Sequence, residues 1–208
     1  MTRQRQRDLV HFSRGGAAEN WTRSNFPWWA VALWLCVGTT GGWCADASGD
    51  SLAAAAYARG VAAYDAKEWD QAAHAWRQAM QLDPNFAEAY VGLGVIFLQQ
   101  GRTTEAEAEF QMALGKNPNQ INALANLGAL AVQRGHYDIA VSYYRKAVGR
   151  EPEDASLWVD LAMCYAGAGE LPAARSAVLN ALAFDAASKE AHALLQRIER
   201  QMALSPLP

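Results

Sequence analysis

Small and large apolar residues recur along the chain with a period of 34 residues between positions 53 and 188. The eighth position of each period is small: Gly60, Gly94, Gly128 and Ala162. The twentieth is alanine (Ala72, Ala106, Ala140 and Ala174), and so is the twenty-seventh (Ala79, Ala113, Ala147 and Ala181). Between these alanines, the twenty-fourth position holds a large apolar residue: Trp76, Phe110, Tyr144 and Val178. The pattern divides the chain into four units, 53–86, 87–120, 121–154 and 155–188, and predicts a pair of antiparallel helices in each.

Helix-breaking residues mark the ends of the two predicted helices in each unit. Gly101, Gly135 and Gly169 are placed to end the first helix, helix A, as C′ glycines. Pro84, Pro118 and Pro152 follow the second helix, helix B, because proline cannot continue a helix. The small eighth residue lets helix A approach helix B closely. We therefore expect Gly94 and Gly128 to accept alanine but no bulky side chain.

One further helix, 189–203, repeats the pattern of helix A without a partner and is followed by a short tail, 204–208. Its apolar stripe consists of Ala191, Leu194, Leu195, Ile198 and Met202. Its other face carries Lys189, Glu190, Arg197, Glu199 and Arg200, which indicates a solvating C-terminal cap.

These positions resemble the tetratricopeptide repeat, whose 34-residue unit reads W-x2-L-G-x2-Y, then A-x3-F, then P. The second unit reads Tyr90-x2-Leu93-Gly94-x2-Phe97, and the resemblance covers 53–188. It implies an all-α fold, an α-solenoid of four helix-turn-helix repeats with a capping helix. The departures lie at the ends: Arg59 replaces the family's Leu in the first unit, and Ala186 replaces Pro in the fourth.

The N-terminal segment has the three parts of a secretory signal peptide. Residues 1–25 form a basic region, with five arginines against Asp8 and Glu19. Residues 26–47 contain the apolar run FPWWAVALWLCV (26–37) and then Ala45-Asp46-Ala47, a small-residue cleavage site. The segment predicts export, with 48–52 as a linker to the repeats. The alternative is an uncleaved transmembrane anchor, because residues 26–45 carry no charge and number 20, just enough to span a bilayer. In either case the repeats lie outside the cytoplasm, in the periplasm or tethered to the inner membrane.

Composition and motifs give no sign of catalysis. The formal net charge of -3 and the acidic repeats disfavour nucleic-acid binding. The four histidines have no metal-ligand spacing, and neither a phosphate loop nor a nucleophile elbow occurs. Cleavage after Ala47 leaves Cys164 as the one cysteine, which we interpret as a small buried hydrophobe. Glu105, Glu107 and Glu109 are interpreted as a solvated surface, since alternate residues do not share a helix face. We expect no cofactor, no metal and no enzyme activity.

The resemblance implies that function rests on a concave face lined by helix A. In this family, the second, fifth, ninth and twelfth positions of helix A face the groove. The predicted partner-binding residues are Tyr57, Val61, Tyr64, Val91, Val95, Leu98, Asn122, Ala125, Asn126, Ala129, Val132, Val159 and Met163. Asn126 alone matches the Lys/Arg/Asn set of relatives that bind C-terminal carboxylates, so that mode is not expected. Most of these residues are apolar, which predicts a partner that offers an apolar extended segment or an amphipathic helix.

Two interpretations of the groove positions remain open. They form a binding surface, or the fifth and ninth positions pack between neighbouring A helices. A binding surface predicts that Val95→Asp and Leu98→Asp abolish partner capture and leave the fold intact. The favoured function is an exported, non-catalytic protein-protein interaction scaffold, an assembly or accessory factor for cell-envelope machinery. The alternative is a membrane-tethered regulatory subunit of an enzyme complex.

Overall fold

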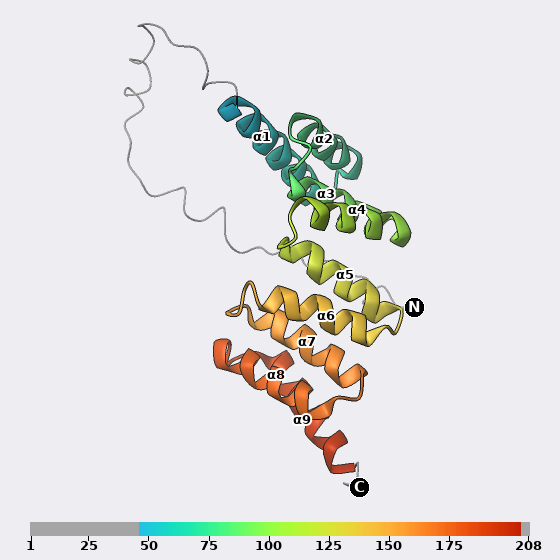
Figure 1. Cartoon of the computed structure of the whole chain (residues 1–208), viewed down its shortest axis with the longest axis vertical. Helices are drawn as coiled ribbons and strands as arrows, with labels where there is room; N and C mark the ends of the chain where they lie inside the picture. Colours follow the sequence, from blue (N-terminus) through green and yellow to red (C-terminus); the bar gives the residue numbers. More distant parts are fainter. Residues whose placement is uncertain (1–45, 205–208) are drawn as a thin grey trace, which may run out of the picture.

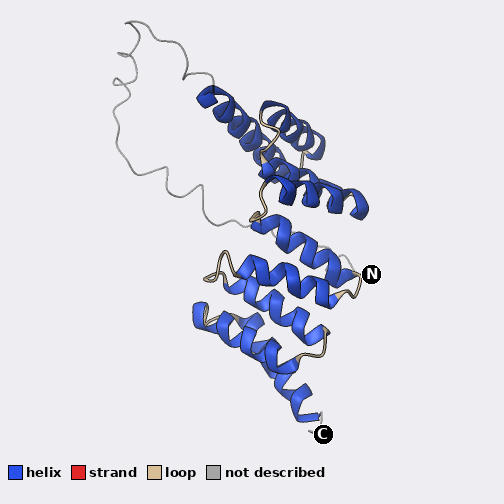
Figure 2. Ribbon diagram, viewed as in Figure 1, coloured by secondary structure: helices blue, strands red, loops and turns tan. Residues whose placement is uncertain are grey.

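The computed structural model describes residues 46–204, which form an elongated stack of helices and turns without a strand (Figures 1 and 2). The helices are α1 Asp46–Asp65, α2 Trp69–Leu82, α3 Ala87–Gln99, α4 Thr103–Lys116, α5 Ile121–Gln133, α6 Tyr137–Val148, α7 Ala155–Gly167, α8 Leu171–Phe184 and α9 Lys189–Leu204. Helices adjacent in sequence pack against each other along the long axis of Figure 1. The predicted α-solenoid of helix pairs with a C-terminal helix is confirmed for this part of the chain.

Helix α1 is longer than the sequence pattern predicts. We expected a linker at 48–52, but the structure places these residues, together with Asp46 and Ala47, in the first turns of α1. No proline interrupts the stretch, so a helix nucleated in the alanine-rich segment that follows can propagate toward the N-terminus. The basic region 1–25 and the apolar run 26–37 lie outside the described residues. Of the helices described, none is both long and apolar enough to cross a bilayer.

Each A helix ends in the same left-handed turn. Gly101, Gly135 and Gly169 have φ of 76°, 78° and 84°, as the C′ prediction requires. The N–H of the next residue bonds back to the helix, as Arg102 does to the Phe97 carbonyl at 2.9 Å. In the first unit the same position is Lys67, with φ of 63°. A side chain with a Cβ is disfavoured there, so this turn is strained.

Three of the four turns that precede α3, α5, α7 and α9 are held by a polar contact from the fourth position of the helix that follows; at the turn before α5 this position is Leu124. Tyr90 donates its hydroxyl to the Pro84 carbonyl at 3.1 Å, and Trp158 donates Nε1 to the Pro152 carbonyl at 2.7 Å. His192 Nε2 lies 3.0 Å from the Ala186 carbonyl, although proline is missing there. The large fourth residue therefore fixes the angle between units as well as filling space.

The core is a ladder of large side chains from the B helices. Trp76, Phe110 and Val178 are fully buried, and Tyr144 is nearly so. A Cβ at Gly94 would lie 2.5 Å from the Phe110 ring, and one at Gly128 would lie 2.6 Å from the Tyr144 ring. The expectation that these glycines accept alanine is therefore wrong, because even a methyl group requires the ring to move.

Trp76 needs a second glycine that the repeat pattern did not reveal. A Cβ at Gly92 on α3 would lie 2.5 Å from the Trp76 ring, and one at Gly60 on α1 would lie 2.4 Å from it. The largest ring in the ladder is thus enclosed by glycine on both neighbouring A helices. The sequence signal was the size of Trp76 relative to its counterparts.

Candidate functional site

The A helices form one face of the stack. Besides the contacts between sequence neighbours, α1 contacts α3 and α7 contacts α9. Side chains of α3 and α5 share one buried cluster, and those of α5 and α7 share another, so the A helices lie along the same side of the stack. We call the second, fifth, ninth and twelfth positions of α1, α3, α5 and α7 the A-helix face.

The structure places the thirteen predicted residues at different depths on this face. The buried ones are Val91, Val95, Leu98, Ala125, Asn126 and Val159; the half-buried ones are Tyr57, Val61, Tyr64, Asn122, Ala129 and Val132; Met163 is exposed. The fifth position is therefore buried in three units. The ninth position goes from fully buried at Val95 through half-buried at Ala129 to exposed at Met163.

Val95 and Leu98 belong to the interior of the protein. They are 0% and 6% exposed and share a buried cluster with Leu127 and Leu130 of α5. A charged residue there would be taken out of water without a partner. The expectation that Val95→Asp and Leu98→Asp spare the fold is therefore replaced by one of strong destabilisation. Whether this part of the face contacts a partner stays a prediction.

Tyr57 and Tyr64 pack into an aromatic cluster at the first unit. The ring centroid of Tyr57 lies 5.3 Å from that of Phe86 and 6.3 Å from that of Trp76. The Tyr64 centroid lies 5.1 Å from that of Trp69 and 5.9 Å from that of Trp76. Burial, with a smaller effect of the Glu88 carboxylate, raises the pKa of Tyr57 to about 12. Both phenols are thus held by core rings at one end of the A-helix face.

Asn126, next to the fifth position on α5, is completely buried. Its Nδ2 donates a hydrogen bond to the Asn122 carbonyl at 2.7 Å, which fixes the side chain against its own helix. Its Oδ1 is buried without a hydrogen-bond partner in the part of the chain that the structure describes.

A hydrogen bond between Tyr144 of α6 and Asp160 of α7 joins these two helices. Burial raises the pKa of Tyr144 above its ordinary range, and the neighbouring Asp160, which is also its hydrogen-bond partner, raises it further. Cys164, one turn beyond Asp160, is 1% exposed. Burial, followed by the charge of Asp160, raises its pKa to about 12, so this thiol stays protonated at neutral pH. The interpretation of Cys164 as a buried hydrophobe is confirmed.

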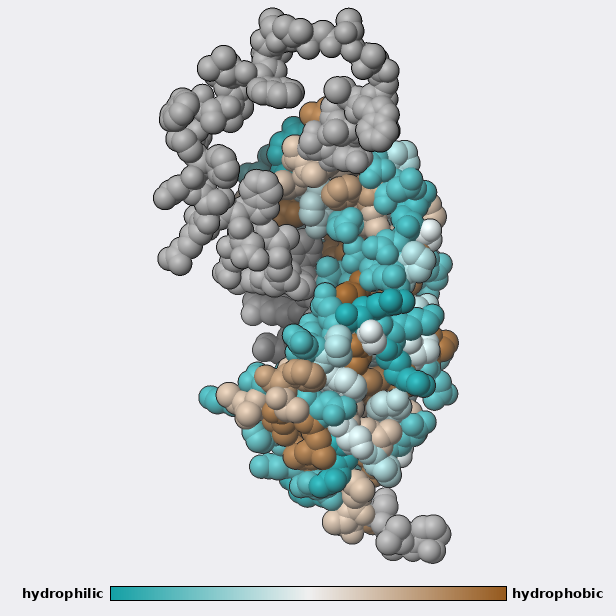
Figure 3. All heavy atoms as spheres, turned by 60° about the vertical axis from the view of Figure 1, so that its left-hand side comes forward, coloured by the Kyte–Doolittle hydropathy of each residue, from teal (hydrophilic) through white to brown (hydrophobic). Residues whose placement is uncertain are grey.

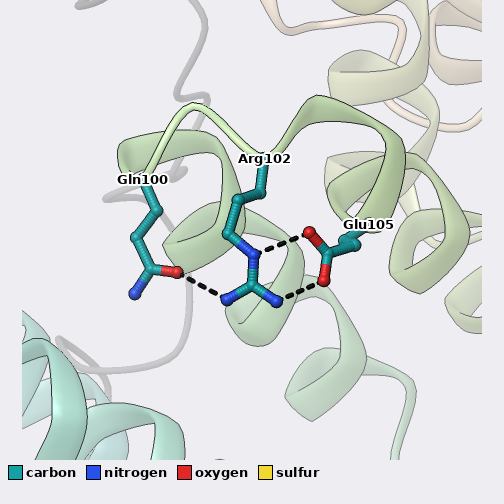
Figure 4. A network of polar contacts seen from close by, with 3 residues as sticks. All are labelled: Gln100, Arg102 and Glu105. Carbon is teal, nitrogen blue, oxygen red and sulfur yellow. Dashed lines mark hydrogen bonds and ion pairs between the residues drawn. The ribbon is translucent and has the colours of Figure 1, made fainter.

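Glu105 and Glu107 of α4 form surface ion pairs, whereas Glu109 is half-buried and burial raises its pKa. Arg102, at the turn between α3 and α4, donates to both carboxylate oxygens of Glu105 and to Gln100 Oε1 (Figure 4). Its guanidinium also lies over the Phe97 ring. The guanidinium lowers the pKa of Glu105 through these hydrogen bonds. Glu107 pairs with Arg134 of the next unit at 2.6 Å. These contacts support turns and neighbouring units, consistent with a solvated surface. Within residues 46–204, no His, Cys, Asp and Glu cluster has the arrangement of a metal site.

An open hollow lies at the C-terminal end of the face, between α7 and α9. Its volume is about 600 Å³, and Met163, Leu194 and Leu204 supply much of its apolar lining. In the view of Figure 3, a cluster of apolar surface lies among hydrophilic residues toward the C-terminal end of the molecule.

Comparison with known proteins agrees with this geometry. One tetratricopeptide repeat family model matches residues 57–121, and another matches residues 131–198. A search of curated protein sequences finds no match.

Several solved structures share the fold. PilF of Pseudomonas aeruginosa has a TM-score of 0.68 and 18% identity, over 75% of this chain and 71% of that one. MamA from Desulfovibrio magneticus RS-1 has a TM-score of 0.64 and 19% identity, over 73% of this chain and 85% of that one. YrrB is described as a TPR protein with an unusual peptide-binding site. It has a TM-score of 0.62 and 22% identity, over 71% of this chain and 76% of that one. The 34-residue period, the helix pairs and these matches show that the chain belongs to the tetratricopeptide repeat family.

Proposed function

We propose that this chain is a non-catalytic protein-protein interaction scaffold outside the cytoplasm, an assembly or accessory factor for cell-envelope machinery. Its A-helix face binds an apolar extended segment or an amphipathic helix of the partner. The observation that carries the proposal is apolar surface left open on this face. Met163 is 37% exposed, and Val61, Ala129 and Val132 are only half-buried.

Two further observations support the proposal. The fold is shared with YrrB, whose description includes a peptide-binding site. Cys164 is 1% exposed and its raised pKa keeps the thiol protonated, so it offers no nucleophile on the A-helix face. A surface that offers shape and apolar area, without reactive groups, is suited to binding.

Binding is tested with a photo-crosslinking amino acid at Met163, and at Met112 of α4 as the matched control, since Met112 is 50% exposed outside the A-helix face. The full chain is expressed in its own cells, and crosslinked products are identified by mass spectrometry. We expect a discrete product from position 163 alone. Met163→Asp should then weaken binding of the purified partner about tenfold, whereas Met112→Asp should leave it unchanged. Equal crosslinking at both positions would contradict the proposal.

Export is tested separately, by fusing residues 1–60 to a reporter that is active only outside the cytoplasm. The basic region and apolar run of residues 1–37 predict an active reporter. A stable fusion that stays in the cytosol with an inactive reporter would contradict the proposed location outside the cytoplasm. It would not affect the proposal that the A-helix face binds a partner.

The second candidate is a membrane-tethered regulatory subunit of an enzyme complex. The specific observation behind it is the uncharged stretch 26–45. N-terminal sequencing of the mature protein separates the two: Ser48 as the first residue indicates a cleaved scaffold, and an intact leader in the membrane fraction indicates a tether.

A further inference from the structure

Helix α9 continues the register of the A helices. Residue 189 begins a fifth period, so its second, fifth, ninth and twelfth positions are Glu190, Ala193, Arg197 and Arg200. All four line the hollow between α7 and α9, together with Met163 at the ninth position of α7. The helix that caps the stack therefore also extends the A-helix face.

The charge of this face changes at α9. From α1 to α7 its charged position is Glu88, whose carboxylate accepts a hydrogen bond from Gln120 Nε2 at 3.1 Å. On α9 it carries two exposed guanidinium groups, Arg197 and Arg200. Neither forms an ion pair within residues 46–204, where the ion pair of α9 joins Glu199 to Arg175 at 3.5 Å.

The hollow combines these cations with apolar surface. Leu194 and Leu204 line it from α9, and Met163 lines it from α7. Leu204 is 82% exposed and Met163 is 37% exposed, so apolar area lies open beside the two arginines. A guanidinium beside an apolar surface suits a ligand that offers a carboxylate next to an apolar side chain.

We infer that the α9 hollow binds an acidic-apolar segment of the partner protein. A large apolar side chain packs against Met163 and Leu204, and an Asp or Glu about one helical turn away pairs with Arg197 and Arg200. The inference rests on the proposed function and adds a direction to it. Because α1 presents aromatic rings and α9 presents cations, the partner lies on the face in one orientation. Glu190 lines the same hollow and repels an acidic group placed beside it, so the acidic residue of the partner is restricted to the position next to Arg197 and Arg200.

The test is a selection of displayed 16-residue peptides, held within a larger coat protein so that no free C-terminal carboxylate is present. The full chain without its leader is the bait, alongside the double variant Arg197→Gln/Arg200→Gln. The matched control is Arg145→Gln/Arg150→Gln, which removes two exposed guanidinium groups at the end of α6 and in the turn that follows it. Circular dichroism checks that each bait is folded.

The wild-type chain should select peptides with Asp or Glu three or four residues from Leu, Ile, Met or Phe. Their affinity should fall about tenfold in the α9 double variant and decline with rising salt, while the control variant binds like the wild type. The reversal Arg197→Glu/Arg200→Glu should select Lys- or Arg-containing peptides instead.

If the wild-type chain selects apolar peptides without Asp or Glu, or if the α9 double variant selects the same peptides as the wild type, then the α9 hollow does not bind an acidic-apolar segment. Either result leaves the proposed scaffold function in place. A wild-type chain that selects no peptide at all overturns both.

Discussion

At the scale of residues, the size of one side chain on helix A is matched to one ring on helix B. Gly94 lies against Phe110 and Gly128 against Tyr144, where a Cβ would come within 2.5 and 2.6 Å of the rings. In the fourth unit, the eighth position is Ala162 and the twenty-fourth is the smaller Val178. The pairs therefore conserve volume at the helix crossing rather than residue type.

Gly94→Ala should destabilise the protein by about 1–3 kcal/mol through overpacking against Phe110. Phe110→Val alone should cost about 2–4 kcal/mol, because it leaves a cavity. The double variant, which copies the Ala162–Val178 pair, should be at least 1 kcal/mol more stable than additivity predicts. Urea unfolding of the four proteins measures this coupling. Additive losses would show that the two sites do not touch.

Lys67 offers a stabilising change. It has φ of 63° where the other units use glycine. Lys67→Gly should raise the free energy of unfolding by about 1 kcal/mol, since glycine carries no steric penalty in this region. The reverse change, Gly135→Lys, should lower it by a similar amount. Thermal and urea unfolding check both, and a neutral or destabilising Lys67→Gly would mean that the Lys67 side chain makes a compensating contact.

Burial of Cys164 predicts an alkaline loss of stability. Its pKa is about 12 in the folded protein against an ordinary 9.0. The folded state therefore holds a proton that the unfolded chain loses, so the contribution is complete below pH 9 and disappears as pH rises toward 12. Between pH 9 and 10.5, the free energy of unfolding of Cys164→Ala should fall by about 1.5 kcal/mol less than that of the wild type, although the variant is less stable at neutral pH. Urea titrations across this range test it, and parallel curves would contradict it.

At the scale of elements, α9 closes the end of the stack on one side only. Ala191, Leu194 and Ile198 are buried in the cluster that includes Val178 and Ala181 of α8. On the opposite side, Leu204 is 82% exposed and Arg197 and Arg200 remain open. The helix is thus a cap, as its sequence pattern predicts, and also carries an open surface.

Ile198→Ala should cost about 2–4 kcal/mol, because the side chain is fully buried between α9 and its neighbours. Leu204→Ala on the same helix should change stability by less than about 0.5 kcal/mol. Thermal unfolding distinguishes them. Equal effects would mean that α9 does not dock as the structure places it.

At the scale of the whole molecule, each helix packs mainly against the helices next to it in the sequence. Sequence neighbours such as α1 and α2, or α7 and α8, pack together, and further contacts join neighbouring A helices, such as α1 with α3 and α7 with α9. A stack of this kind has a stability that sums units and nearest-neighbour interfaces. Local opening is therefore easiest at the ends.

Hydrogen exchange should be slowest in α4, α5 and α6 and become faster toward α1 and α9. Ile198→Ala should accelerate exchange in α8 and α9 before it affects α3. Peptide-resolved exchange measured by mass spectrometry shows the gradient. Uniform protection, lost at a single rate, would instead indicate one cooperative core.

The sequence alone determined the repeat, the helix pairs and their ends. Gly101, Gly135 and Pro118 act through local backbone geometry, and the small eighth position of helix A recurs in every unit. Such features need only short-range physics, so their positions can be read directly from the period.

Only the tertiary structure decided how deep each side chain lies. Val95 and Met163 occupy the same position of helix A, yet one is fully buried and the other 37% exposed. A period assigns a residue to a face of a helix, but exposure depends on the volumes that neighbouring helices bring to that face. The same reason hid the hollow where Met163 meets Arg197, since its two walls belong to helices that are not adjacent in the sequence.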